Sequence, residues 1–155
     1  MAVRRADPAR LLAAVNAQRA ALGGEPWSGA RTPEALGAGC ADAVLGAIDL
    51  GRPAEREALR GAVGYLLGLL AARAPGRAVE VRIPPYAAVQ CVEGPRHTRG
   101  TPPNVVETDP VTWIQLAAGR ISWASAAGDG RLRASGPRAD LSGYLPLVGA
   151  DARWA

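Results

Sequence analysis

The densest group of residues that could do chemistry is a polar loop containing Arg96, His97 and Arg99. In a functional interpretation, the two arginines hold a carboxylate or phosphate group while His97 donates a hydrogen bond. In a structural interpretation, an arginine pairs with Glu107 or Asp109 and the histidine bonds to the backbone, because long ordered loops need such contacts. We favour the structural interpretation, and Asp109 by itself is typical of a helix N-cap.

Metal binding and nucleophilic catalysis both lack a suitable set of residues. A structural zinc site needs about four nitrogen or sulfur ligands, whereas this chain has one histidine and the distant cysteines Cys40 and Cys91. Thr98 and Thr101 flank His97, but close neighbours on one loop seldom give a nucleophile–base geometry. No Gly-x-Ser-x-Gly turn or phosphate-binding glycine loop occurs. We therefore expect no metal, no cofactor and no catalytic residue.

Charge and composition exclude two further classes of partner. The net charge is +4 and all 18 basic residues are arginine, but they are scattered, and only Arg4-Arg5 and the pair Arg131/Arg133 lie close together. This pattern predicts solvated arginines and no nucleic-acid binding. The most apolar stretch, from Tyr65 to Ala72, is too short to cross a bilayer. With two free thiols and no signal peptide, we expect a cytoplasmic protein with at most transient membrane contact.

The first half of the chain is predicted to form three helices. Asp7-Pro8 and Thr32-Pro33 each place a capping side chain before a proline, which is typical of a helix start, and a third helix opens near Arg52-Pro53. Apolar residues then recur at helical spacing until Gly23-Gly24 and Pro75-Gly76 end the first and third helices. We divide the chain into a helical segment, residues 1–52, that packs on a main domain, residues 53–150.

In the second half of the chain, the spacing of the apolar residues changes from that of helices to that of strands. Apolar and charged residues alternate from Val79 to Ile83, and a short apolar run follows from Tyr86 to Val92, so we predict an antiparallel hairpin. The stretch from Asn104 to Thr108 is a third strand.

Further elements follow Asp109-Pro110, which starts a helix that ends at Gly119. Ser122 caps a short helix, and Arg131 to Ser135 forms another strand. A final amphipathic helix is predicted to open at Asp140 or Ser142 and to carry Leu141, Tyr144, Leu145 and Val148. The order predicts an α+β fold, with a small, mostly antiparallel sheet covered on one face by helices.

Three stretches resemble the bacterial branch of the sterol carrier protein family. They are Ala74 to Tyr86, Val89 to Pro110, and Ala134 to Ser142. The resemblance spans roughly Leu59 to Leu147, with Arg120 where the family more often has lysine. It implies a small sheet with helices on one side, an apolar tunnel between them, and a C-terminal helix that helps to close the tunnel. The implied partner is a lipid-like small molecule that is bound without being chemically changed.

Aromatic residues such as Trp113 on core-facing helix positions could line such a tunnel or simply form the core, and sequence does not separate the two. Our candidates for the lining are Ile114, Leu116, Trp123, Leu132, Leu141, Tyr144 and Leu145.

We rank three functional hypotheses. The first is a carrier of an apolar ligand. The second is a packed interaction module with the same fold and no open cavity, for which alanine-rich helices such as Thr32 to Gly51 suit a helix–helix contact. The third is a relative of the accessory domain of bacterial thiol-dependent maleylpyruvate isomerases, although the helical segment contains no histidine. The protein is expected to be a monomer or a homodimer.

Overall fold

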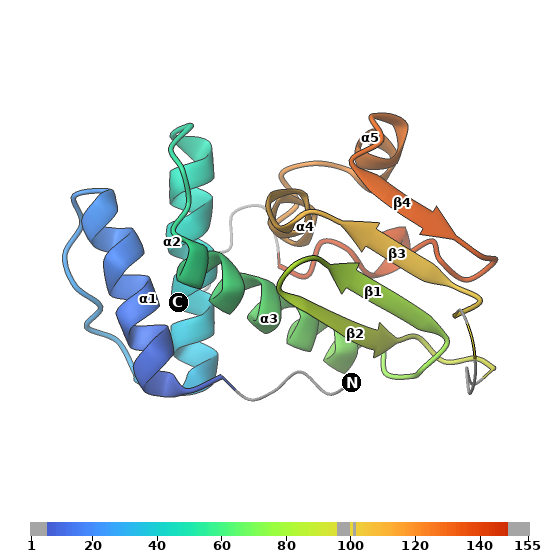
Figure 1. Cartoon of the computed structure of the whole chain (residues 1–155), viewed down its shortest axis with the longest axis horizontal. Helices are drawn as coiled ribbons and strands as arrows, with labels where there is room; N and C mark the ends of the chain where they lie inside the picture. The colour runs from blue at the N-terminus through green and yellow to red at the C-terminus, as the bar shows by residue number, and fades with distance from the viewer. Residues whose placement is uncertain (1–5, 96–99, 101, 149–155) are drawn as a thin grey trace.

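The computed structural model describes residues 6–95, 100 and 102–148, and Figure 1 shows their arrangement. The first two helices stand at one end of the molecule, the sheet lies at the other, and the third helix runs between them (Figure 1). In chain order the elements are α1 (Pro8–Ala21), α2 (Pro33–Asp49), α3 (Arg56–Arg73), β1 (Val79–Ile83), β2 (Ala87–Cys91), β3 (Val105–Thr108), α4 (Pro110–Ala117), α5 (Trp123–Gly128), β4 (Leu132–Ser135) and the short 3₁₀ helix η1 (Ser142–Tyr144).

The four strands form one mixed sheet in the order β2-β1-β3-β4. Both outer pairs are antiparallel and the central pair is parallel, so that Val81 of β1 lies opposite Val89 of β2 and Val106 of β3. The predicted hairpin is β1 and β2. The predicted α+β fold with a small, mostly antiparallel sheet is therefore confirmed.

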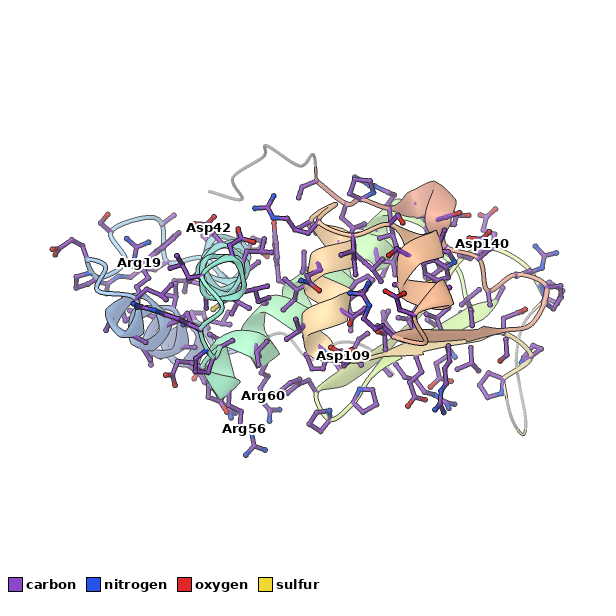
Figure 2. The ribbon with its side chains drawn as sticks, turned by 90° about the horizontal axis from the view of Figure 1, so that it is seen from above. Arg19, Asp42, Arg56, Arg60, Asp109 and Asp140 are labelled. Carbon is purple, nitrogen blue, oxygen red and sulfur yellow. The ribbon has the colours of Figure 1, made fainter. Side chains whose placement is uncertain are left out.

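Helices cover one face of this sheet. Val79, Val81 and Ile83 are buried, whereas Glu80 and Arg82 between them are partly exposed. Figure 2 shows the sheet along its edge, with α4 and α5 lying on the same side of it. Alternation in β1 thus places the apolar residues under the helices and the charged residues on the open face.

Charges of opposite sign alternate across the open face. Arg82 is opposite Glu107 of β3, which is in turn opposite Arg133 of β4. Arg82 Nε also lies 3.0 Å from Glu80 Oε1, and this hydrogen bond is the main reason that the pKa of Arg82 is raised. Such cross-strand pairs compensate one another, so this face carries no extended patch of one sign.

The predicted starts of four helices are confirmed by side-chain caps. Asp7 accepts from Ala9 N at 3.1 Å, and Asp109 accepts from Thr112 N at 2.9 Å. Thr32 and Ser122 cap α2 and α5 in the same way. These contacts satisfy amide groups that have no partner within the helix.

Helix α3 begins at Arg56, three residues later than the predicted opening at Pro53. Glu55 takes the N-cap position without a side-chain hydrogen bond, and its backbone N–H donates to Oε1 of the buried Gln18 on α1 at 2.7 Å. A contact with another helix therefore fixes where α3 starts, and the local sequence does not show it.

Glycines allow the three long helices to approach closely. A Cβ added at Gly61 of α3 would lie 2.9 Å from Leu11 Cδ2 and 3.0 Å from Cys40 Sγ, and one added at Gly37 of α2 would lie 2.8 Å from Tyr65 Cβ. These distances are too short for ordinary carbon contacts. Gly37, which weakens α2 as an isolated helix, and Gly61 of α3 are thus needed where α1, α2 and α3 pack together.

The prediction of a final amphipathic helix is wrong. Only Ser142–Tyr144 form one turn of 3₁₀ helix, and Leu145 is already extended, with φ −111° and ψ 148°. Pro146 explains the difference, because a proline disfavours the helical conformation of the preceding residue and provides no amide donor. Of the apolar residues assigned to this helix, Leu141 takes the N-cap position of the 3₁₀ turn, Tyr144 ends that turn, and the extended chain begins at Leu145.

Asn104 connects three parts of the chain at one end of the sheet. Its Nδ2 donates to Ala78 O at 2.9 Å, and its Oδ1 accepts from Arg138 N at 2.9 Å. Its backbone carbonyl accepts from Glu80 N at 3.0 Å. Buried Asn104 therefore holds β1, the start of β3 and the turn after β4 together, and its side-chain oxygen contacts that turn.

We predict that Gly136→Ala strongly destabilises this junction. Gly136 has φ +101°, and an added Cβ would clash with the carbonyl oxygen of Pro103 and with Asn104 Oδ1. We expect a loss of about 3 kcal/mol or more in the free energy of unfolding, measured by urea denaturation. Gly130→Ala is the matched control, since Gly130 has φ +74° with open space around it and should cost only about 1 kcal/mol. Equal losses for the two variants would contradict this account.

We also predict that both cysteines are unreactive in the folded protein. Burial raises the pKa of Cys40 to about 12 and that of Cys91 to about 11, so neither forms much thiolate at pH 8. Because the thiolate is the reactive form, a disulfide reagent such as DTNB should modify neither residue in buffer and both in guanidinium chloride. Rapid reaction of either thiol in the native protein would show that its surroundings are open.

Candidate functional site

The hydrophobic interior is divided into two clusters. The larger one joins the helices α1 to α4 with the covered face of the sheet. The smaller one, which we call the satellite cluster, consists of Leu116 of α4, Ala126 of α5 and Leu132 of β4. Trp123 and Leu145 are only partly buried and pack against both clusters. They therefore form the boundary between the main core and the satellite cluster.

The structure brings four of the seven predicted lining residues together. Leu116 and Leu132 are in the satellite cluster, and Trp123 and Leu145 are at its boundary. The other three belong to the main core, where Ile114 and Leu141 are fully buried and Tyr144 packs against the cluster. The polar candidates Arg96, His97 and Arg99 lie outside the residues that the structure describes.

Two hydrogen bonds position the strand that supports the satellite cluster. Thr108 of β3 is paired with Leu132, and its Oγ1 donates to Arg131 O at 2.6 Å. The backbone N–H of Arg131 donates in turn to Ala126 O at the end of α5, at 2.9 Å. Leu132 is thereby placed beneath α5. Ala134, two residues further along the same face of β4, is exposed, so the helical cover of the sheet ends at this edge.

The C-terminal segment, residues 144–148, lies across the ends of α3 and α4. Leu147 N donates to Ala117 O at 2.9 Å, which provides a partner for a carbonyl group at the end of α4. The Arg73 guanidinium at the end of α3 donates to the carbonyl groups of Tyr144, Pro146 and Leu147, at 3.0, 2.7 and 2.7 Å. These contacts hold Leu145, which lies within the segment, against the satellite cluster.

The satellite cluster offers hydrocarbon surface and few polar groups. The buried polar side chains among the described residues are Gln18, Asn104, Thr108 and Thr112, and none of them is charged. No three His, Cys, Asp or Glu side chains of the described part of the chain come together as metal ligands would.

The sequence did not identify Arg73, which holds the C-terminal segment, or Asn104, which connects the strands at the end of the sheet away from the satellite cluster. Arg73 is a typical basic residue in the last turn of a helix, but its three acceptors belong to a segment that was predicted to be helical. Asn104 was assigned only to the start of a strand, and its contacts with residues 78 and 138 are distant in the sequence. A polar residue directly before an apolar strand was the one available signal.

Comparison with protein families finds one match, to a family described as bacterial SCP ortholog, over residues 55–147. The match begins at the N-cap of α3 and ends in the C-terminal segment, so it covers more than half of the chain and includes the sheet and the satellite cluster. The helices α1 and α2 precede it. No curated protein matches the chain. In the described part of the chain, no helix has the length and apolar character needed to traverse a bilayer.

We predict that Arg73→Met loosens the C-terminal segment. Methionine keeps the packing of the side-chain stem but cannot donate the three hydrogen bonds, so the free energy of unfolding should fall by about 1–2 kcal/mol. Hydrogen exchange of the Leu147 amide should accelerate more than that of amides in α2. Arg77→Met is the matched control, because Arg77 is exposed and makes no side-chain hydrogen bond with other described residues. Unchanged exchange at Leu147 would contradict the role assigned to Arg73.

Proposed function

We propose that this chain, which belongs to the family of bacterial SCP orthologues, binds a lipid-like apolar molecule without acting on it chemically. The ligand inserts at the satellite cluster, between α4, α5 and β4 and beneath the C-terminal segment. The single observation that carries the proposal is the separation of this small hydrocarbon cluster from the main core, with partly buried Trp123 and Leu145 between them.

Trp123 and Leu145, which lie between the two clusters, determine where a ligand can enter with the smallest loss of packing free energy. Ile114 and Leu141 in the main core are completely buried, and moving them would expose close-packed surface. Trp123 and Leu145 are already partly exposed, so rotating them away forfeits less buried area. Each methylene group of a ligand that replaces them contributes about 0.8 kcal/mol of favourable transfer free energy. An acyl or isoprenoid chain of moderate length can therefore offset the loss of these contacts.

The interaction-module hypothesis receives less support from the surface. The large hydrophobic side chains exposed in the described part of the chain are Leu50 and Val111, at the end of α2 and the start of α4. Two single residues on different helices do not make the contiguous apolar patch that is typical of a docking site. The third hypothesis, a relationship to the accessory domain of thiol-dependent isomerases, assigns no role to any residue of the satellite cluster.

The test is native mass spectrometry of the purified full chain, followed by solvent extraction and lipid analysis. We predict a bound species in the lipid mass range that Leu132→Trp and Leu145→Trp each reduce at least fivefold, because the larger ring fills the space the ligand needs. Leu50→Trp is the matched control: Leu50 is 64% exposed, so the same ring is added away from the site.

The two filling variants keep this test decisive. Leu132 is buried and its replacement could prevent folding, whereas Leu145 is partly buried and tolerates a larger side chain better. Folding of each variant is verified by circular dichroism and by a cooperative urea transition. Protein that stays free of ligand after incubation with fatty acids, isoprenoids and sterols would refute the proposal, as would equal lipid loss in the Leu50→Trp control.

A further inference from the structure

Trp113 of α4 carries a buried donor that has no acceptor among the described residues. Its side chain is the largest of those that are almost fully buried, at 2% exposure, and its Nε1–H makes no hydrogen bond. The indole of Trp27 is different, because its Nε1 donates to Ala30 O at 3.0 Å. Buried tryptophan N–H groups usually have a partner, and leaving one unpaired has a considerable desolvation cost.

Two other buried donors lack an acceptor in the described part of the chain, and neither is comparable. Gln18 Nε2 lies on α1, and the other end of that amide accepts from Glu55 N. Arg131 Nε belongs to a guanidinium whose Nη2 is already 2.8 Å from Asp129 Oδ2. Trp113 is thus the unpaired donor whose side chain has no other polar contact.

The position of Trp113 relates this donor to the proposed ligand site. Leu116 follows it by three residues and therefore lies next to it on the same face of α4. Leu116 belongs to the satellite cluster, whereas Trp113 itself and the adjacent Ile114 belong to the main core. The indole ring accordingly belongs to the main core, one helical turn before the residue by which α4 enters the satellite cluster.

We propose that Trp113 Nε1–H is the polar anchor of the bound ligand and donates a hydrogen bond to an uncharged oxygen, a hydroxyl or carbonyl group, on an otherwise apolar molecule. This inference rests on the proposed function and specifies the class of ligand. The ligand oxygen supplies the acceptor that the described residues lack, and the hydrocarbon part replaces contacts of Trp123 and Leu145 at the satellite cluster.

The shortage of unpaired charge around Trp113 favours an uncharged head group. Among the described residues the wholly buried polar side chains are neutral, and the guanidinium of Arg131, whose Nε is buried, is paired with Asp129 at 2.8 Å. Asn104, Thr108 and Thr112 are moreover already engaged in hydrogen bonds within the protein. An ionised carboxylate or phosphate beside Trp113 would lose its hydration and gain one neutral donor in return, which does not compensate for burying a charge.

The experiment uses the ¹⁵N-labelled full chain and three probes of equal chain length: 1-octanol, octane and octanoate. The indole N–H resonance of Trp113 is assigned by its disappearance in Trp113→Phe. We expect 1-octanol to move this resonance downfield, octane to bind without that shift, and octanoate to bind at least tenfold more weakly than the alcohol. The Trp27 indole resonance is the internal control and should stay in place with every probe, because its donor is already bonded.

Affinity and stability of Trp113→Phe complete the test. The variant should bind 1-octanol about tenfold more weakly than the wild type, the effect of one lost hydrogen bond, and octane equally well. Without ligand its free energy of unfolding should fall, because phenylalanine leaves part of the volume of the buried indole empty even though it removes an unpaired donor. Unchanged octanol affinity in the folded variant would show that the donor does not bond to the ligand and would overturn the inference.

The outcomes separate the anchor from the site. If octane and 1-octanol both bind, and the Trp113 resonance stays unshifted, the ligand site stands and the anchor is refuted. If neither 1-octanol nor octane shifts any resonance of the satellite cluster in the wild type, the proposed function fails together with the anchor.

Discussion

Close packing around α3 is the constraint on which the other parts of the structure depend. This helix lies against α1 and α2 on one side and against β2 and α4 on another. Its approach to α1 and α2 requires a position without a side chain, and Gly61 provides it beside Leu11 and Cys40. The same helix ends at Arg73, whose guanidinium holds the C-terminal segment. A change in the position of α3 would therefore move the sheet, α4 and the C-terminal segment together.

The division of the interior into two clusters gives them different physical roles. The main core contains most of the fully buried side chains and so provides most of the apolar area removed from water. The satellite cluster is small, rests on an edge strand, and is covered by side chains that are only partly buried. Regions with few buried contacts open at lower free energy than the core of a protein. The satellite cluster can therefore open for a ligand while the main core keeps the domain folded.

Local signals in the sequence were sufficient for most elements of the fold. Capping residues before prolines located the starts of α1, α2 and α4, and the alternation from Val79 to Ile83 identified β1 together with the face it buries. The end of the chain was mispredicted because the apolar spacing of a helix was given more weight than Pro146. Of the candidate site, the apolar residues of α4 and β4 could be predicted. The contacts of Arg73 and Asn104 could not, since their partners are far apart in sequence.

The C-terminal segment also affects how the domain is completed during synthesis. Chains emerge from the ribosome N-terminus first, so α1, α2 and α3 are available to pack before the sheet exists. The parallel pairing of β1 with β3 has to wait for residues 105–108. The cover over the satellite cluster waits longer still, because Leu147 must reach both Ala117 and Arg73. For that interval the nascent domain presents an uncovered apolar surface, and a truncated product that lacks these last contacts would present it permanently to chaperones and proteases.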